Sequence, residues 1–134
     1  MNPNLLKCKA QQIVSGKWLY GFVVPVIYNG EELRYFIVDL FNKFLTIEMR
    51  NEIDPNTICK FTGTCDANNQ EIYEGDVVDT PHGRTVVCYD DIMMTYILHH
   101  ENKYLGYLYE NDEINVIGNI CDDINWFNEE LDND

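Results

Sequence analysis

Oxygen-bearing side chains stand at regular spacing in the stretch 61–83, which reads FTGTCDANNQEIYEGDVVDTPHG. They occupy the first, third and fifth positions of the segment that begins with Asp66, as they do in a calcium-binding loop. That loop also requires glycine at its sixth position and a bidentate acid at its twelfth, and these positions hold Glu71 and Val77. The paired asparagines of the segment instead tolerate the left-handed conformation of a tight turn. The spacing therefore predicts a reverse turn and no calcium site.

A second candidate in this stretch is the carboxylate pair Glu74 and Asp76, which flank Gly75. Paired carboxylates can serve general acid–base catalysis, but no companion base stands near them in the sequence. Acids at a turn are usually solvated, so we expect exposed carboxylates here. Gly75 can form a sharp corner through a positive φ, and Asp76 can accept hydrogen bonds from the amides of that turn. We therefore predict that these two acids have a structural role and no catalytic one.

Histidine and cysteine give the remaining candidates for metal binding or nucleophilic chemistry. His99 and His100 would point to opposite faces of a strand, so they cannot hold one metal ion without a bulge. Neither histidine stands at zinc-ligand spacing from Cys88 or Cys121. A cysteine–histidine nucleophile pair meets in space and not along the chain, so the sequence selects no such pair. We expect a protein that is not an enzyme and that binds no metal or organic cofactor.

Cysteine usage and hydropathy bear on the cellular compartment. The five cysteines are an odd number without CxxC spacing, which favours free thiols in a reducing cytoplasm over a disulfide framework. No run approaches the roughly 18 apolar residues of a membrane helix, and Met1–Ala10 lacks the core of a signal peptide. With 46% hydrophobic residues, the 134-residue chain can bury the core of one domain or of two small subdomains. The expected location is the cytoplasm.

Charge is divided unevenly along the chain, whose formal net charge is −14. Residues 1–60 carry seven Lys and Arg against six Asp and Glu, a balance of +1. Residues 61–134 carry two Lys and Arg against seventeen Asp and Glu, a balance of −15. Such an excess of acids repels phosphate backbones, which disfavours nucleic-acid binding by the second half. Two alternatives remain for the acids: they keep a strand-rich module soluble, or they form a face that a partner recognises.

Alternation of apolar residues predicts strands in the first half. The run KWLYGFVVPVIY at 17–28 has period two, and the Asn-Gly pair at 29–30 is typical of a tight hairpin. The return strand is LRYFIVDL at 33–40, which is rich in aromatic and β-branched residues. Residues 43–50 fit either a strand or a short helix. A loop signal around Pro55 separates this subdomain, residues 1–60, from the rest.

The second half has the pattern of a series of short strands separated by polar turns. One predicted strand is IMMTYILHH at 92–100, which follows a predicted turn at Asp90 and Asp91. Five β-rich segments within roughly 45 residues are typical of a small SH3-like barrel or an open sheet, which we assign to residues 61–121. In residues 122–134 the apolar spacing becomes helical behind two aspartates that could cap a helix. The predicted fold is all-β, with two small β subdomains and a short C-terminal helix that ends in a frayed tail.

The motif IDPNTICKFTGTCDANNQEIYEGDVV at 53–78 resembles the signature of the YopX family of phage and prophage proteins. The segments GKWLYG at 16–21 and INVIGNI at 114–120 resemble two further parts of that family's pattern. Asn69, Cys65 and the tail after Ile120 depart from the pattern. The residues that match the central signature include Thr62, Gly63, Asp66, Tyr73, Glu74, Gly75 and Asp76.

The resemblance implies a mostly β fold in two parts and an origin in a phage, a prophage or another mobile element. It supplies no established activity, catalytic residue or cofactor. We therefore expect the turn-rich stretch to join the two β subdomains and to start the second one.

Two aromatic regions are candidates for an interaction surface. Trp18 and its aromatic neighbours lie in the least acidic region, near Lys17 and Arg34, a composition found both in single-strand nucleic-acid platforms and in β cores. In YLGYLY, residues 104–109, both alternating faces are apolar, which indicates burial of one face and a partner on the other. The candidate surface residues are Trp18, Tyr104, Tyr107 and Tyr109.

These features predict an accessory protein of a phage or mobile element that acts in the host cytoplasm by binding another protein, from the host or the phage. A second copy of the chain is an alternative partner. In a sharper variant, the acidic face imitates DNA and occupies the basic groove of a host protein. The alternative from another class is single-stranded nucleic-acid binding through the aromatics and cations of residues 7–36.

Overall fold

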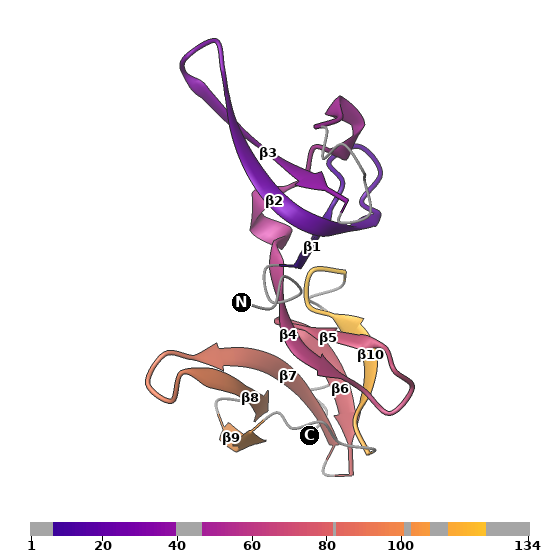
Figure 1. Cartoon of the computed structure of the whole chain (residues 1–134). Helices are drawn as coiled ribbons and strands as arrows, with labels where there is room; N and C mark the ends of the chain where they lie inside the picture. The colour runs from indigo at the N-terminus through magenta and orange to yellow at the C-terminus, as the bar shows by residue number, and fades with distance from the viewer. Residues whose placement is uncertain (1–6, 40–46, 82, 101–102, 108–112, 123–134) are drawn as a thin grey trace. The chain divides into compact units, whose positions relative to one another are not determined.

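The computed structural model describes residues 7–39, 47–81, 83–100, 103–107 and 113–122. Within these residues the chain forms antiparallel strands and short turns of 3₁₀ helix (Figure 1). The prediction of an all-β fold is therefore confirmed. In these segments no helix is long and apolar enough to cross a membrane.

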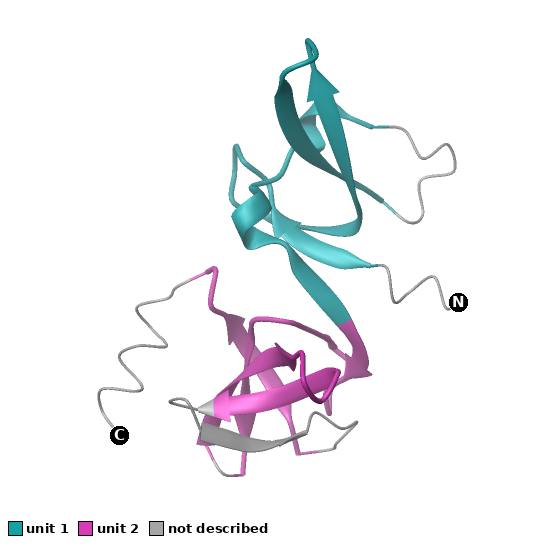
Figure 2. Ribbon diagram, turned by 90° about the vertical axis from the view of Figure 1, so that its left-hand side faces the viewer, with its two compact units in different colours: residues 1–61 teal, residues 62–134 magenta. Residues whose placement is uncertain are grey.

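The chain divides into two compact units, residues 1–61 and residues 62–134 (Figure 2). Strand β4 (Cys59–Cys65) begins in the first unit and ends in the second. It pairs with β1 (Cys8–Gln11) at its start and with β5 (Glu71–Tyr73) further along. The turn-rich stretch of the sequence begins in β4, where the chain passes from one unit to the next.

The first unit has the strand order β3-β2-β1-β4, and its paired strands are antiparallel. The strands that follow β1 are β2 (Trp18–Tyr28) and β3 (Glu32–Val38). Between them, Asn29 and Gly30 have φ of 53° and 75°. The Glu31 amide donates a hydrogen bond of 3.1 Å to the Tyr28 carbonyl oxygen. This is the tight hairpin that the Asn-Gly pair predicts, because both central residues of such a turn need positive φ.

The first unit has its own hydrophobic core. Buried Ala10, Ile37 and Ile53 form it, and half-buried Leu19, Val23, Tyr35 and Ile58 pack against them. The chain between β3 and β4 contains two 3₁₀ turns, Met49–Asn51 and Pro55–Thr57. It lies beside β3, since the Ile53 amide donates a hydrogen bond of 3.0 Å to the Tyr35 carbonyl oxygen. Of the segment 43–50, residues 49 and 50 are thus helical, and residues 43–46 lie outside the described residues.

One glycine lets the strands of this sheet come close together. Gly21 in β2 has φ of +156°, and a Cβ atom there would lie 2.1 Å from the Val38 carbonyl oxygen in β3. Contact with a backbone atom at that distance cannot be relieved by turning a side chain. Glycine is therefore required at this position.

The second unit contains a five-stranded antiparallel sheet with the order β10-β6-β7-β8-β9. Its strands are β6 (Asp76–Thr80), β7 (Gly83–Asp90), β8 (Thr95–His100), β9 (Lys103–Tyr107) and β10 (Asn115–Asn119). Buried Ile72, Val78, Val87, Leu98 and Ile114 form its core, with Tyr96 and Val116 packed against them. Thr85 in β7 is also fully buried, and its hydroxyl has no hydrogen-bond partner among the described residues.

Two features of the second unit differ from the sequence-based predictions, and a third prediction falls on residues that the structure does not describe. Among the described strands, β9 and β10 form the two edges of the sheet and no pairing joins them. A closed barrel requires its first and last strands to share a ladder, so the described strands form an open sheet, and the predicted SH3-like barrel is not supported. The predicted strand IMMTYILHH begins only at Thr95, because residues 92–94 form a turn. The predicted helix at 122–134 lies outside the described residues, except for Asp122, which is in a turn.

Candidate interaction surface

Asp66 holds both a turn and a distant strand. Its side chain is buried, and its Oδ1 accepts hydrogen bonds from the amides of Asn68 at 2.8 Å and Gln70 at 2.9 Å. Its Oδ2 accepts a third bond, of 3.0 Å, from the amide of Val116 in β10. The predicted reverse turn is therefore present, with Asn69 at φ of 63°. Hydrogen bonds to a charged acceptor are stronger than neutral ones, so this carboxylate stabilises the edge of the sheet.

Asp76 does the same at the other end of β10. It is 0% exposed, and its Oδ2 accepts a hydrogen bond of 2.7 Å from the Tyr73 amide. Its Oδ1 accepts a bond of 2.8 Å from Nδ2 of Asn119, whose own Oδ1 accepts one of 2.8 Å from the Cys121 amide. The expected bond from the amides of the turn is confirmed, but the expected exposure of this acid is wrong. Donors from the turn and from β10 enclose the carboxylate instead.

The other residues of the signature also make contacts within the second unit. Thr62 Oγ1 donates a hydrogen bond of 2.7 Å to the Ile72 carbonyl oxygen. Gly75 has φ of 86°, and its amide donates a bond of 2.8 Å to the Val87 carbonyl oxygen. The remaining residues are Gly63, with φ of 86°, Tyr73, which is buried, and Glu74, which is half-buried. The contacts of the signature thus hold turns and strands in place.

Aromatic rings of the first unit lie against cations of the same chain. The Nζ atom of Lys9 is 4.6 Å from the centroid of the Trp18 ring, and that of Lys7 is 5.1 Å from the Phe61 ring. Lys9 is only 7% exposed, so little of its side chain is presented to solvent. Trp18 is half-buried, and Tyr20 is exposed. These cation–π pairs contribute to packing, and an ammonium group held against a ring offers less to a phosphate group.

Two arginines of the first unit are paired with carboxylates. Arg34 lies 3.3 Å from Glu32 and 3.8 Å from Glu52, and its guanidinium also lies 4.7 Å from the centroid of the Tyr28 ring. The hydrogen bond and the charge of Glu32 raise the pKa of Arg34. Arg50 lies 2.6 Å from an oxygen of Glu48. Both arginines therefore have part of their charge balanced within the chain.

The hairpin between β7 and β8 presents apolar and acidic side chains together. We call residues 89–94 the β7–β8 surface; its members are Tyr89, Asp90, Asp91, Ile92, Met93 and Met94. Ile92 is 90% exposed and Met94 is 76% exposed. The Asp90 carboxylate fixes the turn, since its Oδ1 accepts hydrogen bonds from the amides of Ile92 at 2.9 Å and Met93 at 3.1 Å. Neighbouring exposed apolar side chains that form one patch are a feature of interaction sites.

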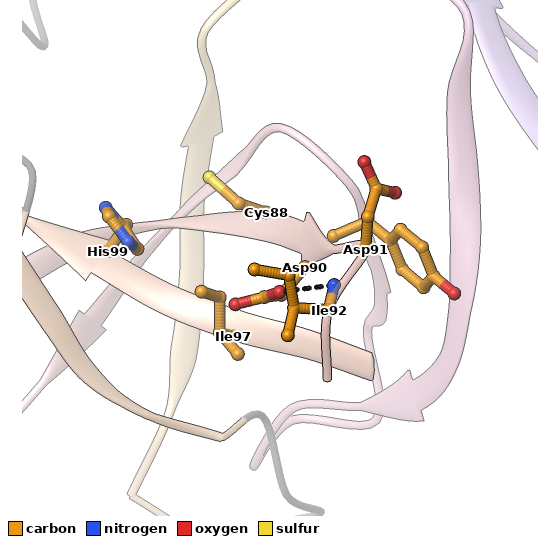
Figure 3. Close-up of a pocket in the computed structure, with 7 residues that line it drawn as sticks. Cys88, Asp90, Asp91, Ile92, Ile97 and His99 are labelled. Carbon is orange, nitrogen blue, oxygen red and sulfur yellow. Dashed lines mark hydrogen bonds between the residues drawn. The ribbon is translucent and has the colours of Figure 1, made fainter. Parts of the chain in front are cut away.

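An open hollow of ≈ 350 Å³ lies beside this turn (Figure 3). Its lining combines residues of the β7–β8 surface, Tyr89 to Ile92, with Cys88, Ile97 and His99. Cys88 pairs with Ile97 across the two strands, and His99 stands opposite Val86, so the thiol and the imidazole belong to one face. Burial and, secondly, the charge of Glu74 raise the pKa of the Cys88 thiol. A nucleophilic cysteine needs the opposite shift, so this environment disfavours thiolate chemistry.

Across the part of the chain that the structure describes, no cluster of three or more His, Cys, Asp or Glu is placed to hold a metal ion.

A family model with the description YopX protein matches residues 28–125. The chain belongs to the YopX family. The resemblance carried by the signature at 53–78 is thereby confirmed. None of the curated proteins compared with this YopX chain matches it.

The fold of this YopX chain is similar to a solved structure. The crystal structure of protein EF1440 from Enterococcus faecalis aligns with a TM-score of 0.52 at 19% sequence identity. The alignment covers 90% of this chain and 96% of the other. At this level of identity the similarity concerns the fold alone.

The predicted surface residues of this YopX protein lie in three places. Trp18 is at the start of β2, against Lys9. Tyr104 and Tyr107 belong to the edge strand β9, where they pair with His99 and Ile97 of β8. Tyr109 lies outside the described residues.

Sequence reasoning missed the β7–β8 surface of the YopX chain. The apolar run at 92–94 was predicted as part of a strand, which would have buried alternate side chains. An aspartate followed by residues whose amides it can bond is a turn signal, and Asp90 is that residue here. The predicted turn at Asp90 and Asp91 is therefore present, but it extends to residue 94, which the apolar run behind it does not indicate.

Proposed function

We propose that this YopX protein is an accessory protein of a phage or another mobile element that works by binding another protein. The partner comes from the bacterial host or the phage, and binding takes place in the cytoplasm through an acidic face of the second unit. The family membership supports the phage-type origin. The excess of fifteen negative charges in residues 61–134 carries the proposal, since such a surface attracts basic partners and repels phosphate backbones.

The proposed role is binding and not catalysis. The signature carboxylates Asp66 and Asp76 are buried and accept hydrogen bonds from backbone amides and an asparagine side chain. Each is thus committed to the fold and withdrawn from solvent. The Cys88 thiol has a raised pKa, which keeps it protonated and poorly nucleophilic near neutral pH.

Single-stranded nucleic-acid binding through the first unit is the second candidate, because Tyr20 is exposed and Trp18 is half-buried beside lysines. Two observations weigh against it. Lys9 is buried against the Trp18 ring, and Arg34 is paired with Glu32 and with the Tyr28 ring. Side chains that already bind each other offer less to bases and phosphates.

Capture of partners from a bacterial lysate tests the proposed function. The full chain is immobilised and exposed to nuclease-treated and untreated lysate, at low and at high salt. We expect a protein partner that survives nuclease treatment and is lost at high salt, because charge attraction between exposed groups is screened. The captured partner is then purified, and its binding to the full chain is measured directly.

Binding of a labelled single-stranded oligonucleotide tests the second candidate function. Capture that disappears with nuclease, together with oligonucleotide binding that Trp18→Ala abolishes, would show that the second candidate is correct. In the DNA-imitating variant, the purified partner is itself a DNA-binding protein, and duplex DNA competes with the YopX chain for it.

A further inference from the structure

Apolar side chains of the β7–β8 surface are held in solvent by a fixed turn. Ile92, Met93 and Met94 are 90%, 49% and 76% exposed. Besides the two amide bonds to the Asp90 carboxylate, the Met94 amide donates a bond of 2.8 Å to the Asp90 carbonyl oxygen. The Asp90 carboxylate and the Ile92 amide that it binds are drawn in Figure 3. Because the turn is ordered before any partner arrives, covering these side chains costs little additional conformational entropy.

The hollow beside the turn gives an apolar side chain a place to enter. Its volume of ≈ 350 Å³ is at the small end of the range for ligand pockets, and Ile92 and Ile97 belong to its lining. Tyr89 is fixed by an edge-on contact with Tyr96, with ring centroids 5.2 Å apart. An open hollow with such walls suits a protruding side chain of a docked segment. Methionine beside it adds an adaptable apolar contact.

Charge decides which kind of partner fits. Asp90 and Asp91 adjoin the apolar tip, within a half of the chain that carries a balance of −15. A second copy of the chain would bring like charges together at this surface, and an anionic lipid surface would be repelled. A cationic segment is attracted.

We infer that the β7–β8 surface docks a protein segment in which an apolar side chain is flanked by lysine or arginine. The apolar side chain packs on Ile92 and Met94 and enters the hollow against Ile97. The flanking cations face Asp90 and Asp91. This inference rests on the proposed protein-binding function and names its surface and the chemistry of the partner.

Fluorescence anisotropy with defined peptides tests the inference on the full chain. The probe is a labelled peptide of leucine flanked by lysines, and its controls replace leucine with serine or lysine with glutamate. Ile92→Asn should weaken binding of the leucine peptide about tenfold or more, because the burial of one large apolar side chain is lost. Val14→Asn is the matched control, since Val14 is 89% exposed in the first unit, and should change the affinity less than about twofold.

A second pair of variants tests the role of charge. Asp91→Asn should weaken binding and reduce its salt dependence, whereas Asp79→Asn, at an exposed position of β6, should do so less. Thermal unfolding of each variant confirms that it folds, which is expected because all the altered side chains are exposed.

The outcomes separate this inference from the proposed function. Equal affinities for the leucine and serine peptides would overturn the inference. Binding would then depend on charge alone, as in the variant in which the acidic face imitates DNA. Equal effects of Ile92→Asn and Val14→Asn would overturn the choice of surface. Preference for a labelled single-stranded oligonucleotide over both cationic peptides would overturn the proposed function itself.

Discussion

Buried polar side chains of the second unit differ in how well their hydrogen bonds are satisfied. Asp76 is fully buried and accepts bonds from the Tyr73 amide and the Asn119 side chain. Thr85 is equally buried, but within the described part of the chain its hydroxyl has no hydrogen-bond partner. A buried polar group without a partner destabilises the folded state, whereas a satisfied carboxylate stabilises it. The two residues therefore predict opposite responses to substitution by apolar side chains.

Thr85→Val should stabilise the second unit. Valine has nearly the same shape and removes a hydroxyl that loses its water on folding, so we expect the free energy of unfolding to rise by about 1 kcal/mol. Urea denaturation followed by circular dichroism measures it. A decrease in stability would mean that the hydroxyl has a partner in solution, such as a buried water molecule.

Cys88 should react slowly with alkylating reagents. Its thiol pKa is raised, first by burial and second by Glu74, so less thiolate is present near neutral pH than in an ordinary cysteine. Glu74→Gln removes the second cause, which lowers the pKa and should speed alkylation at a given pH. Mass spectrometry after iodoacetamide treatment measures the rate. The urea-unfolded chain is the control, and equal rates in the folded and unfolded states would contradict the account.

At the scale of elements, strand β10 is held to the sheet by side chains as well as by its ladder. It pairs with β6, and the ladder is irregular between Val116 and Gly118. Asp66 binds the Val116 amide and Asp76 binds the Asn119 side chain, on the two sides of this irregularity. The signature at 53–78 and the segment 114–120, which are distant in sequence, are thus parts of one structural arrangement.

Asp76→Ala should destabilise the second unit by about 3 kcal/mol. The substitution removes a charged acceptor and leaves the Tyr73 amide and the Asn119 amide group without it. Asp79→Ala, on the exposed side of the same strand, should change the stability by less than about 0.5 kcal/mol. Urea denaturation measures both variants. A similar loss for the two would show that net charge and not the buried contacts controls stability here.

Elements were predictable from the sequence where the information is local. Period-two alternation in 17–28 and the Asn-Gly pair at 29–30 predict a strand and a hairpin that the structure contains. The burial of Asp76 was not predictable, because it depends on Asn119, 43 residues away. The same reason applies to barrel closure, which depends on whether two edge strands meet. Such non-local contacts leave no periodic trace in the sequence.

At the scale of the whole molecule, the second unit combines an excess of acids with an exposed apolar tip. Residues 61–134 hold seventeen of the acids, and the β7–β8 surface within them exposes Ile92, Met93 and Met94. In the first unit, Lys9 and Arg34 are engaged with aromatic rings and Arg50 with a carboxylate. The charge division was visible in the sequence. The location of the apolar tip was not, because a three-residue run looks the same in a strand and in a turn.

Mapping of binding by nuclear magnetic resonance tests the central claim most directly, namely that this YopX protein recognises a basic protein partner through its second unit. The isotope-labelled full chain is titrated, in separate samples, with the peptide of leucine flanked by lysines and with a single-stranded oligonucleotide. The account predicts that the peptide shifts the amide signals of residues 89–97 and that the oligonucleotide leaves those of residues 7–11 and 18–22 unchanged. Shifts of Lys9, Trp18 and Tyr20 with the oligonucleotide, and none at residues 89–97 with the peptide, would contradict it.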